Sequence, residues 1–270
     1  MTPEQGNIES LVNEYQSLDL SAIIDFDKFN QYSIVHHSAT IEGSTLTEIE
    51  TRLLLDEGLT PKGKPILHSL MVQDHQKALL FVLDEPKKKT IPSARFIQTI
   101  NAIVMKNTGT VYNTALGKID STKGMFRKGN VSAGNSYFVN YDKVPGLVDE
   151  LCKKISERIT TAETTEDRLN LSFDAHFDLV TIHPFYDGNG RTSRLLMNFI
   201  QQLYGLPLSI VFKEDKAEYF KALIDARANE DISIFRSFMY EQTAKHLAEE
   251  IRKYKEIKNP GKGGRFSMVF

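Results

Sequence analysis

The chain has 270 residues, of which 41% are hydrophobic, and a net charge of −2. It is long enough to bury a core in one large domain or two small ones. Its interspersed charges exclude a general attraction to nucleic acid or to a membrane surface, and no apolar run approaches the roughly 20 residues of a membrane span. The polar N-terminus is not expected to be a secretory signal. A single cysteine, Cys152, excludes an internal disulfide and a cysteine-rich metal site, and a cytoplasmic protein is expected.

Helical periodicity dominates the chain and predicts a mainly α fold. In chain order, the expected helices cover residues 7–17, 21–37, 45–57, 66–84, 92–107, 144–163, 167–182, 189–204, 215–229 and 231–256. Apolar alternation and three glycines between residues 122 and 141 predict a β-hairpin. The segment 86–90 reads as a linker. We therefore expect an N-terminal helical region over 1–88, a core over 89–256 and a flexible tail over 257–270.

The most informative run lies just before the eighth of these helices. It reads His183-Pro-Phe-Tyr-Asp187-Gly188-Asn189-Gly190-Arg191-Thr-Ser-Arg194. Glycines let the backbone approach a ligand, and a helix that begins here offers free N–H groups and the positive end of its dipole. Arginines three residues apart can both reach the first turn. This order of parts is what a phosphate site needs.

Each group in the run also has a chemical role to offer. Asp187 is a hard oxygen ligand suited to Mg²⁺ on phosphate oxygens. Gly188, Asn189 and Gly190 can form an anion-binding nest, in which the Asn189 side chain adds a donor. Arg191 and Arg194 can neutralise outer phosphates, and His183 has the ordinary pKa of a general base.

Blander interpretations exist for every one of these residues taken alone. His183 would be a helix cap, the Asp-Gly and Asn-Gly pairs would be turn signals, and the two arginines would be a solvated face. Phe185 is most simply a core anchor. Because an ordinary turn does not require a base, an acid and two arginines together, their coincidence favours the phosphate site.

A second patch lies at residues 38–44, Ser-Ala-Thr-Ile-Glu-Gly-Ser. It predicts a helix C-terminus with Gly43 as the left-handed cap. Read alone, Glu42 is a solvent-exposed acid in the last turn, where it is slightly unfavourable against the helix dipole. That position raises the question of which group offsets it.

The run at 183–194 resembles, at every fixed position, the signature of the Fic (Fido) family, His-Pro-Phe-x-Asp-Gly-Asn-Gly-Arg-x-x-Arg. Flanking sequence extends the resemblance over roughly residues 30–240. It implies a helical bundle with a small β-hairpin flap and an enzyme that moves AMP from ATP to a hydroxyl side chain of a target protein. His183 would take the hydroxyl proton, Asp187 would hold Mg²⁺, and the glycine-flanked turn with both arginines would hold the phosphates.

The resemblance implies further roles outside the signature. The flap would bind the target backbone by strand addition, with Met125, Val131 and Phe138 as candidate clamp residues, and Tyr219 would lie near the adenine. Residues 38–44 resemble the family's inhibitory motif, marked here by Ser38, Glu42 and Gly43. In relatives with this motif the glutamate pairs with the second arginine, Arg194 here, and blocks productive placement of the γ-phosphate.

The sequence leaves alternatives open. The same site could remove AMP from a protein, with Glu42 orienting a water molecule. A non-catalytic nucleotide-binding module belongs to another class, and the intact His183 and Asp187 argue against it. We expect neither nucleic acid nor a membrane as partner, and the chain could form a homo-oligomer.

Overall fold

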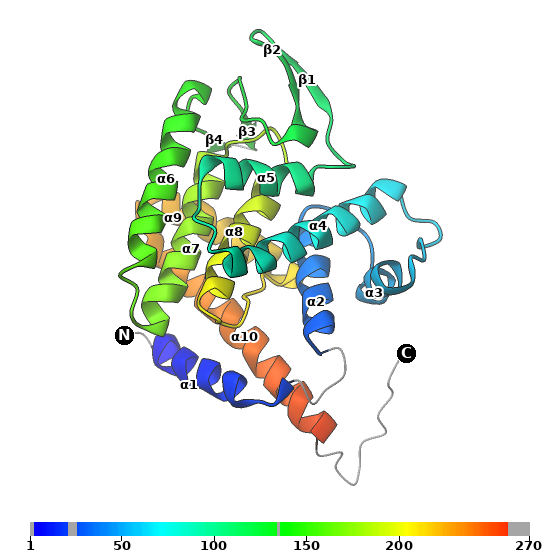
Figure 1. Ribbon diagram of the computed structural model, residues 1–270, viewed down its shortest axis with the longest axis vertical. Coiled ribbons are helices and arrows are strands. Elements are labelled where there is room, and N and C mark those ends of the chain that lie inside the picture. The colour runs from blue at the N-terminus through cyan, green and yellow to red at the C-terminus, as the bar shows by residue number, and fades with distance from the viewer. Residues whose placement is uncertain (1–2, 21–25, 134–135, 259–270) are drawn as a thin grey trace.

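The structure is a computed structural model that describes residues 3–20, 26–133 and 136–258. Its α-helices are α1 (Pro3–Ser17), α2 (Phe26–Ile41), α3 (Glu48–Glu57), α4 (Ile66–Asp84), α5 (Ala94–Val104), α6 (Val144–Ile159), α7 (Thr165–Ile182), α8 (Asn189–Leu203), α9 (Lys216–Ala228) and α10 (Ile232–Lys258). The mainly α prediction is confirmed (Figure 1). No helix in the described part of the chain is long and apolar enough to cross a membrane.

Local sequence explains where several helices begin and end. At the start of α3, the Thr47 hydroxyl accepts a hydrogen bond from the Glu50 backbone N–H while the Glu50 carboxylate accepts one from the Thr47 backbone. Thr164 and Asp167 form the same capping box at the start of α7. Such caps satisfy backbone donors that have no partner within the helix.

The predicted helix boundaries differ from the observed ones by a few residues at several places. Helix α2 continues to Ile41, beyond the expected end at residue 37. Helix α10 continues to Lys258, two residues into the expected tail, and the rest of that tail lies outside the described residues. Residues 21–25 at the expected start of the second helix also lie outside them.

Two small antiparallel pairs of strands lie together beside the helices, at the top of Figure 1. Strands β3 (Ser132–Ala133) and β4 (Ser136–Tyr137) fall within the predicted hairpin, whose glycine at 134 is outside the described residues. We call the segment 125–140 the flap. Strands β1 (Val111–Thr114) and β2 (Gly117–Asp120) form a hairpin that the sequence analysis missed.

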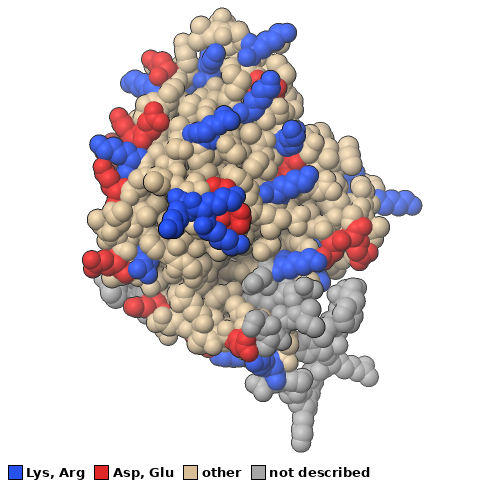
Figure 2. All heavy atoms as spheres, in the orientation of Figure 1, with Lys and Arg blue, Asp and Glu red and all other residues tan. Residues whose placement is uncertain are grey.

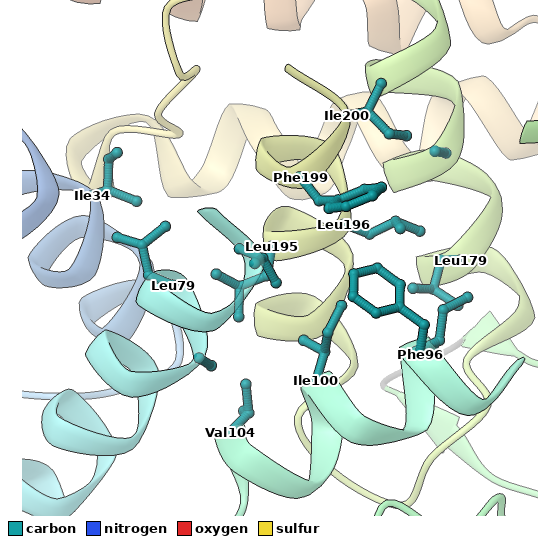
Figure 3. Close-up of a cluster of buried hydrophobic side chains, with 14 of the residues drawn as sticks. Ile34, Leu79, Phe96, Ile100, Val104, Leu179, Leu195, Leu196, Phe199 and Ile200 are labelled. Carbon is teal, nitrogen blue, oxygen red and sulfur yellow. The ribbon is translucent and has the colours of Figure 1, made fainter. Parts of the chain in front are cut away.

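Helix α8 occupies the centre of the molecule and is buried on almost every side. Phe199 packs on Phe96 of α5 with ring centroids 4.7 Å apart. In Figure 3, its apolar side chains face residues from α2, α4, α5 and α7, drawn as Ile34, Leu79, Phe96, Ile100, Val104 and Leu179. A helix surrounded in this way is held in a fixed position, and so is the loop at its N-terminus.

The same core crosses the predicted boundary at residue 88. Leu79 of α4 and Ile34 of α2 belong to one buried cluster with residues of α5 and α8. The expected linker contains a short 3₁₀ helix, Glu85–Lys88, in which Glu85 is buried and accepts a hydrogen bond from the Thr90 hydroxyl. The division of the chain into two regions stays a prediction, but the helices on both sides of residue 88 share this core.

Truncating the central helix should destabilise the whole fold. We predict that Phe199→Ala lowers the free energy of unfolding by about 3–5 kcal/mol, because a fully buried aromatic side chain leaves a cavity. Ile91→Ala, at a side chain that is 71% exposed, should change it by less than about 0.5 kcal/mol. Urea denaturation measures both, and equal effects would contradict the central position of Phe199.

Candidate functional site

The loop between α7 and α8 is fixed by its own side chains. His183 ends α7 with a left-handed backbone, φ 52°, and Gly188 begins α8 with φ 76°. The Asn189 carboxamide accepts a hydrogen bond from the Phe185 N–H and donates one to the Phe185 carbonyl, both at 2.9 Å. The Phe185 side chain is buried in the core, as expected of an anchor. The loop therefore has one defined shape.

Asn189 has a structural role in this loop. Its side chain is 4% exposed, and its oxygen and its nitrogen each form a hydrogen bond with the Phe185 backbone. Its carboxamide thereby fixes the backbone that an anion would meet. A further hydrogen bond from this side chain to a bound phosphate stays a prediction.

Asp187 is the exposed acid of the loop, with 53% of its side-chain surface accessible. Its backbone carbonyl accepts a hydrogen bond from Asn101 of α5, which also donates to the Thr192 hydroxyl. A Cβ at Gly188 would lie 2.8 Å from the Asn101 amide nitrogen, so glycine is needed for this close approach. Asn101 thus holds the aspartate in place, a function that its sequence context does not signal.

The His183 imidazole faces the flap. It stacks on Phe138 with ring centroids 3.9 Å apart and an angle of 16° between the planes. The pKa of His183 is lowered to about 4, chiefly by burial and in part by the nearby guanidinium groups of Arg127 and Arg227. The imidazole is therefore neutral at physiological pH and has a nitrogen lone pair available to accept a proton.

Arg127 joins the flap to the loop between α7 and α8, which we call the catalytic loop because it contains the candidate base His183. Its guanidinium donates to the carbonyl oxygens of His183, Gly129 and Val139, and its backbone N–H donates to the Pro184 carbonyl. The side chain is 2% exposed. Only carbonyls accept from it, so this arginine acts as a structural tie between the two ends of the flap and the end of α7.

Both arginines of the run are buried, which excludes their reading as a solvated face. Arg191 is 2% exposed and donates to the Val104 carbonyl and to the Met105 sulfur. Arg194 is 4% exposed and points towards α2. Arg191 therefore contacts the end of α5, and Arg194 contacts the end of α2.

The residues that meet Arg194 come from the second patch found in the sequence. Its guanidinium donates to the Ser38 hydroxyl at 2.8 Å, to the Ser38 carbonyl at 3.2 Å and to the Glu42 carboxylate at 2.6 Å. Gly43, with φ 102°, follows the end of α2 and turns the chain away, as expected of a helix-ending glycine. Glu42 and Arg194, 152 positions apart, form the ion pair that the resemblance implies.

The Glu42 carboxylate lies directly over the first turn of α8. A Cβ on residue 190 would come within 2.4 Å of Glu42 Oε1, so Gly190 makes room for it. Burial acts to raise the pKa of Glu42, but Arg194 and Arg191 outweigh it and hold the pKa below its ordinary value. A charged carboxylate therefore occupies a position where a helix N-terminus and an arginine would bind a phosphate.

Tyr219 lies behind this pair and cannot contact a nucleotide base. Its side chain is 1% exposed. Its hydroxyl lies 2.8 Å from His176 Nε2 and accepts a weak hydrogen bond from Arg194 at 3.5 Å. The prediction that Tyr219 borders the adenine is therefore wrong. The residue supports Arg194 from the core.

Among the candidate clamp residues, the structure distinguishes Phe138, because its ring covers His183. Met125 and Val131 are half-buried in the flap. A further aromatic contact ties the first hairpin to the same loop, since Tyr112 of β1 stacks on Tyr186 with centroids 4.6 Å apart. Both hairpins thus border the loop that carries His183 and Asp187.

Comparisons with known proteins agree with this geometry. Residues 91–201 match the model of the Fic/DOC family. A protein adenylyltransferase Fic of Drosophila melanogaster is 32% identical over 216 residues, which cover 79% of this chain and 40% of that protein. The chain spans less than half the length of the curated relatives it matches.

Two solved structures share the fold over most of the chain. Fic-1 from C. elegans superposes with a TM-score of 0.78 and 25% identity, covering 96% of this chain and 73% of that one. A Fic-domain signalling protein from Bacteroides thetaiotaomicron superposes with a TM-score of 0.79 and 23% identity, covering 92% and 97%.

The stack of Phe138 on His183 predicts a measurable pKa. We expect the imidazole of His183 to titrate near pH 4 by NMR, and Phe138→Ala to raise that pKa towards the ordinary 6.5, because losing the ring exposes the imidazole to water. Tyr137→Ala removes a neighbouring ring that is 88% exposed and should leave the pKa unchanged. A His183 pKa near 6.5 in the unaltered protein would contradict the description.

Proposed function

We propose that residues 91–201, which match the Fic/DOC family model, form a Fic domain and that the protein is an adenylyltransferase that transfers AMP from ATP to a hydroxyl side chain of another protein. The observation that carries the proposal is one loop, at the start of α8, that holds a neutral imidazole, an exposed carboxylate and an anion-binding helix terminus. Curated relatives that match most of this chain bear the name protein adenylyltransferase.

The reaction requires a base on one side of the α-phosphate and charge stabilisation on the other. His183 would take the proton of the target hydroxyl, whose oxygen forms a bond to the α-phosphorus. The bond between that phosphorus and the bridging oxygen to the β-phosphate breaks, and pyrophosphate leaves with the electron pair. The backbone N–H groups at the start of α8 and the guanidinium of Arg194 would bind the departing phosphates.

Asp187 fits a magnesium ion, because its carboxylate is exposed beside the helix terminus. In the described part of the chain no group of three or more acidic, histidine or cysteine side chains could hold a metal. A single carboxylate suits Mg²⁺ bound mainly through substrate phosphates and water. The ion would neutralise phosphate charge, while the Asn101 contact keeps Asp187 oriented.

The ion pair between Glu42 and Arg194 supports self-inhibition in this proposal. The γ-phosphate of ATP needs Arg194, but Glu42 and Ser38 hold that guanidinium from α2. ATP could then bind only with its phosphates displaced, and a misplacement near 1 Å costs about 10²-fold in rate. The low pKa of Glu42 keeps the carboxylate charged throughout the physiological range.

A second candidate function uses the same residues. The charged Glu42 carboxylate faces the start of α8, where it could orient a water molecule that removes AMP from a modified protein. The two functions respond oppositely to loss of Glu42, because transfer should rise and removal should stop. A non-catalytic binding module would bind ATP with or without Glu42, and it would neither transfer AMP to a protein nor remove it.

Asp187→Ala should make transfer nearly undetectable and insensitive to Mg²⁺, because the variant lacks the only acidic side chain of the loop. Asp142→Ala, at an exposed acid outside the loop, should keep the unaltered Mg²⁺ dependence. Labelled-ATP transfer measured over a Mg²⁺ titration tests the assignment. An Asp187→Ala curve that matches the unaltered protein would remove Asp187 from the metal site.

Glu42→Gly should raise the rate of transfer by about 10²-fold while changing ATP affinity much less, since it frees Arg194 without touching the base. The variant should still fold, because Arg194 retains two hydrogen bonds to Ser38. Incorporation of labelled AMP into the enzyme itself or into lysate proteins measures the rate. The variant Glu42→Gly with His183→Ala is the negative control. Labelling no faster than the unaltered protein would refute the inhibitory role.

A further inference from the structure

The part of the molecule that borders the site on the flap side carries an excess of positive charge. Between Met105 and Lys143 the sequence has six basic residues and two acidic ones, in a chain of net charge −2. One of the six, Arg127, is buried in the flap tie. The other five are exposed lysines, at positions 106, 118, 123, 128 and 143.

Most of this charge has no internal partner. Lys123 lies 3.7 Å from Asp120. Among the described residues, no ion pair involves Lys106, Lys118, Lys128 or Lys143, in contrast to exposed lysines on the 3₁₀ helix after α4 and on α6, α9 and α10. We call these four residues the lysine surface. Figure 2 shows lysine and arginine side chains over the upper part of the molecule, where the two hairpins lie in Figure 1.

The contacts of neighbouring residues place three of these lysines close to the catalytic loop. Lys128 follows Arg127, which hydrogen-bonds to the His183 carbonyl. Lys118 lies on the first hairpin, whose Tyr112 stacks on Tyr186, and it pairs with Asn113, so its side chain leaves the opposite face of the strands from that tyrosine. Lys106 follows Met105, whose sulfur accepts from Arg191.

The fourth lysine lies at the base of the flap. Asn130 accepts a hydrogen bond from the Tyr141 N–H at 3.1 Å and its amide donates to Asn140 at 3.2 Å. These bonds close the flap two residues before Lys143. The lysine surface therefore borders the loop from several directions, on elements that hold the catalytic base rather than on the α2 side that holds Arg194.

We infer that the lysine surface selects protein substrates in which acidic residues flank the modified hydroxyl. This inference rests on the proposed transfer to a protein. A hydroxyl that reaches His183 must pass the flap, so the chain on either side of it lies over these lysines. Carboxylates there would be attracted over about one Debye length, roughly 10 Å at 0.1 M salt, and basic segments would be repelled.

The test uses three synthetic peptides with one central threonine, flanked by glutamates, by lysines or by serines. They are labelled by the full chain carrying Glu42→Gly with labelled ATP at low salt. We expect kcat/KM for the acidic peptide to exceed that for the basic peptide by about tenfold, at the low end of electrostatic steering. The preference should shrink as salt is added.

Two double variants then locate the effect. Lys118→Glu with Lys128→Glu should abolish or reverse the preference by raising KM for the acidic peptide, while KM for ATP stays unchanged. Lys62→Glu with Lys77→Glu makes the same charge change at exposed lysines on the loop before α4 and on α4, and should preserve the preference.

Equal labelling of the three peptides, or equal effects of the two double variants, would overturn the inference. A rise in KM for ATP with no change for peptide would assign the lysines to the nucleotide and overturn it as well. In each case, labelling of any peptide or of the enzyme itself would show that the proposed transferase activity stands. Absence of all labelling would instead contradict that activity.

Discussion

The ion pair between Glu42 and Arg194 is the interaction on which the site depends. The guanidinium is almost fully buried, and a buried charge without a partner is costly. Glu42 lies at the C-terminus of α2, where a negative charge is unfavourable against the helix dipole, but its carboxylate reaches the positive end of α8. The pair thus gives the buried Arg194 guanidinium a counter-charge. It also places the Glu42 carboxylate at the positive end of α8, where a negative charge is favourable.

This pair also joins the N-terminal helix α2 to the rest of the molecule. Helix α2 supplies Ser38 and Glu42 to Arg194 and apolar side chains to the common core. On the other side, Tyr219 and His176 close the space behind the guanidinium with a short hydrogen bond. The arginine is therefore held between α2 on one side and buried residues of α7 and α9 on the other.

Much of the site could be predicted from the sequence because its signals are local. The run from His183 to Arg194 contains the loop and the helix start, and glycines at 43 and 188 adopt the positive φ that their positions suggest. The helices could be located from periodicity, because the apolar residues that a helix buries recur at regular spacing within one segment of the chain. The pairing of Glu42 with Arg194 came from the family resemblance rather than from spacing.

The features that were missed or wrong depend on contacts between distant segments. Nothing near Asn189 indicates that its amide turns back to Phe185, and nothing near Tyr219 shows that α9 buries it behind Arg194. Arg127 donates to the His183 carbonyl, 56 positions away, and Asn101 donates to a carbonyl and a hydroxyl that lie 86 and 91 positions away. The hairpin of β1 and β2 is short and largely exposed, so its alternation is weak.

A double-mutant cycle of transfer rates, comparing Glu42→Gly, Arg194→Ala and both together with the unaltered protein, tests the central claim most directly. If the two side chains act through one pair, Arg194→Ala should remove most of the gain from Glu42→Gly, which gives a large coupling between the sites. Additive effects, with the full gain persisting in the absence of Arg194, would show that Glu42 does not act by holding this arginine and would contradict the account.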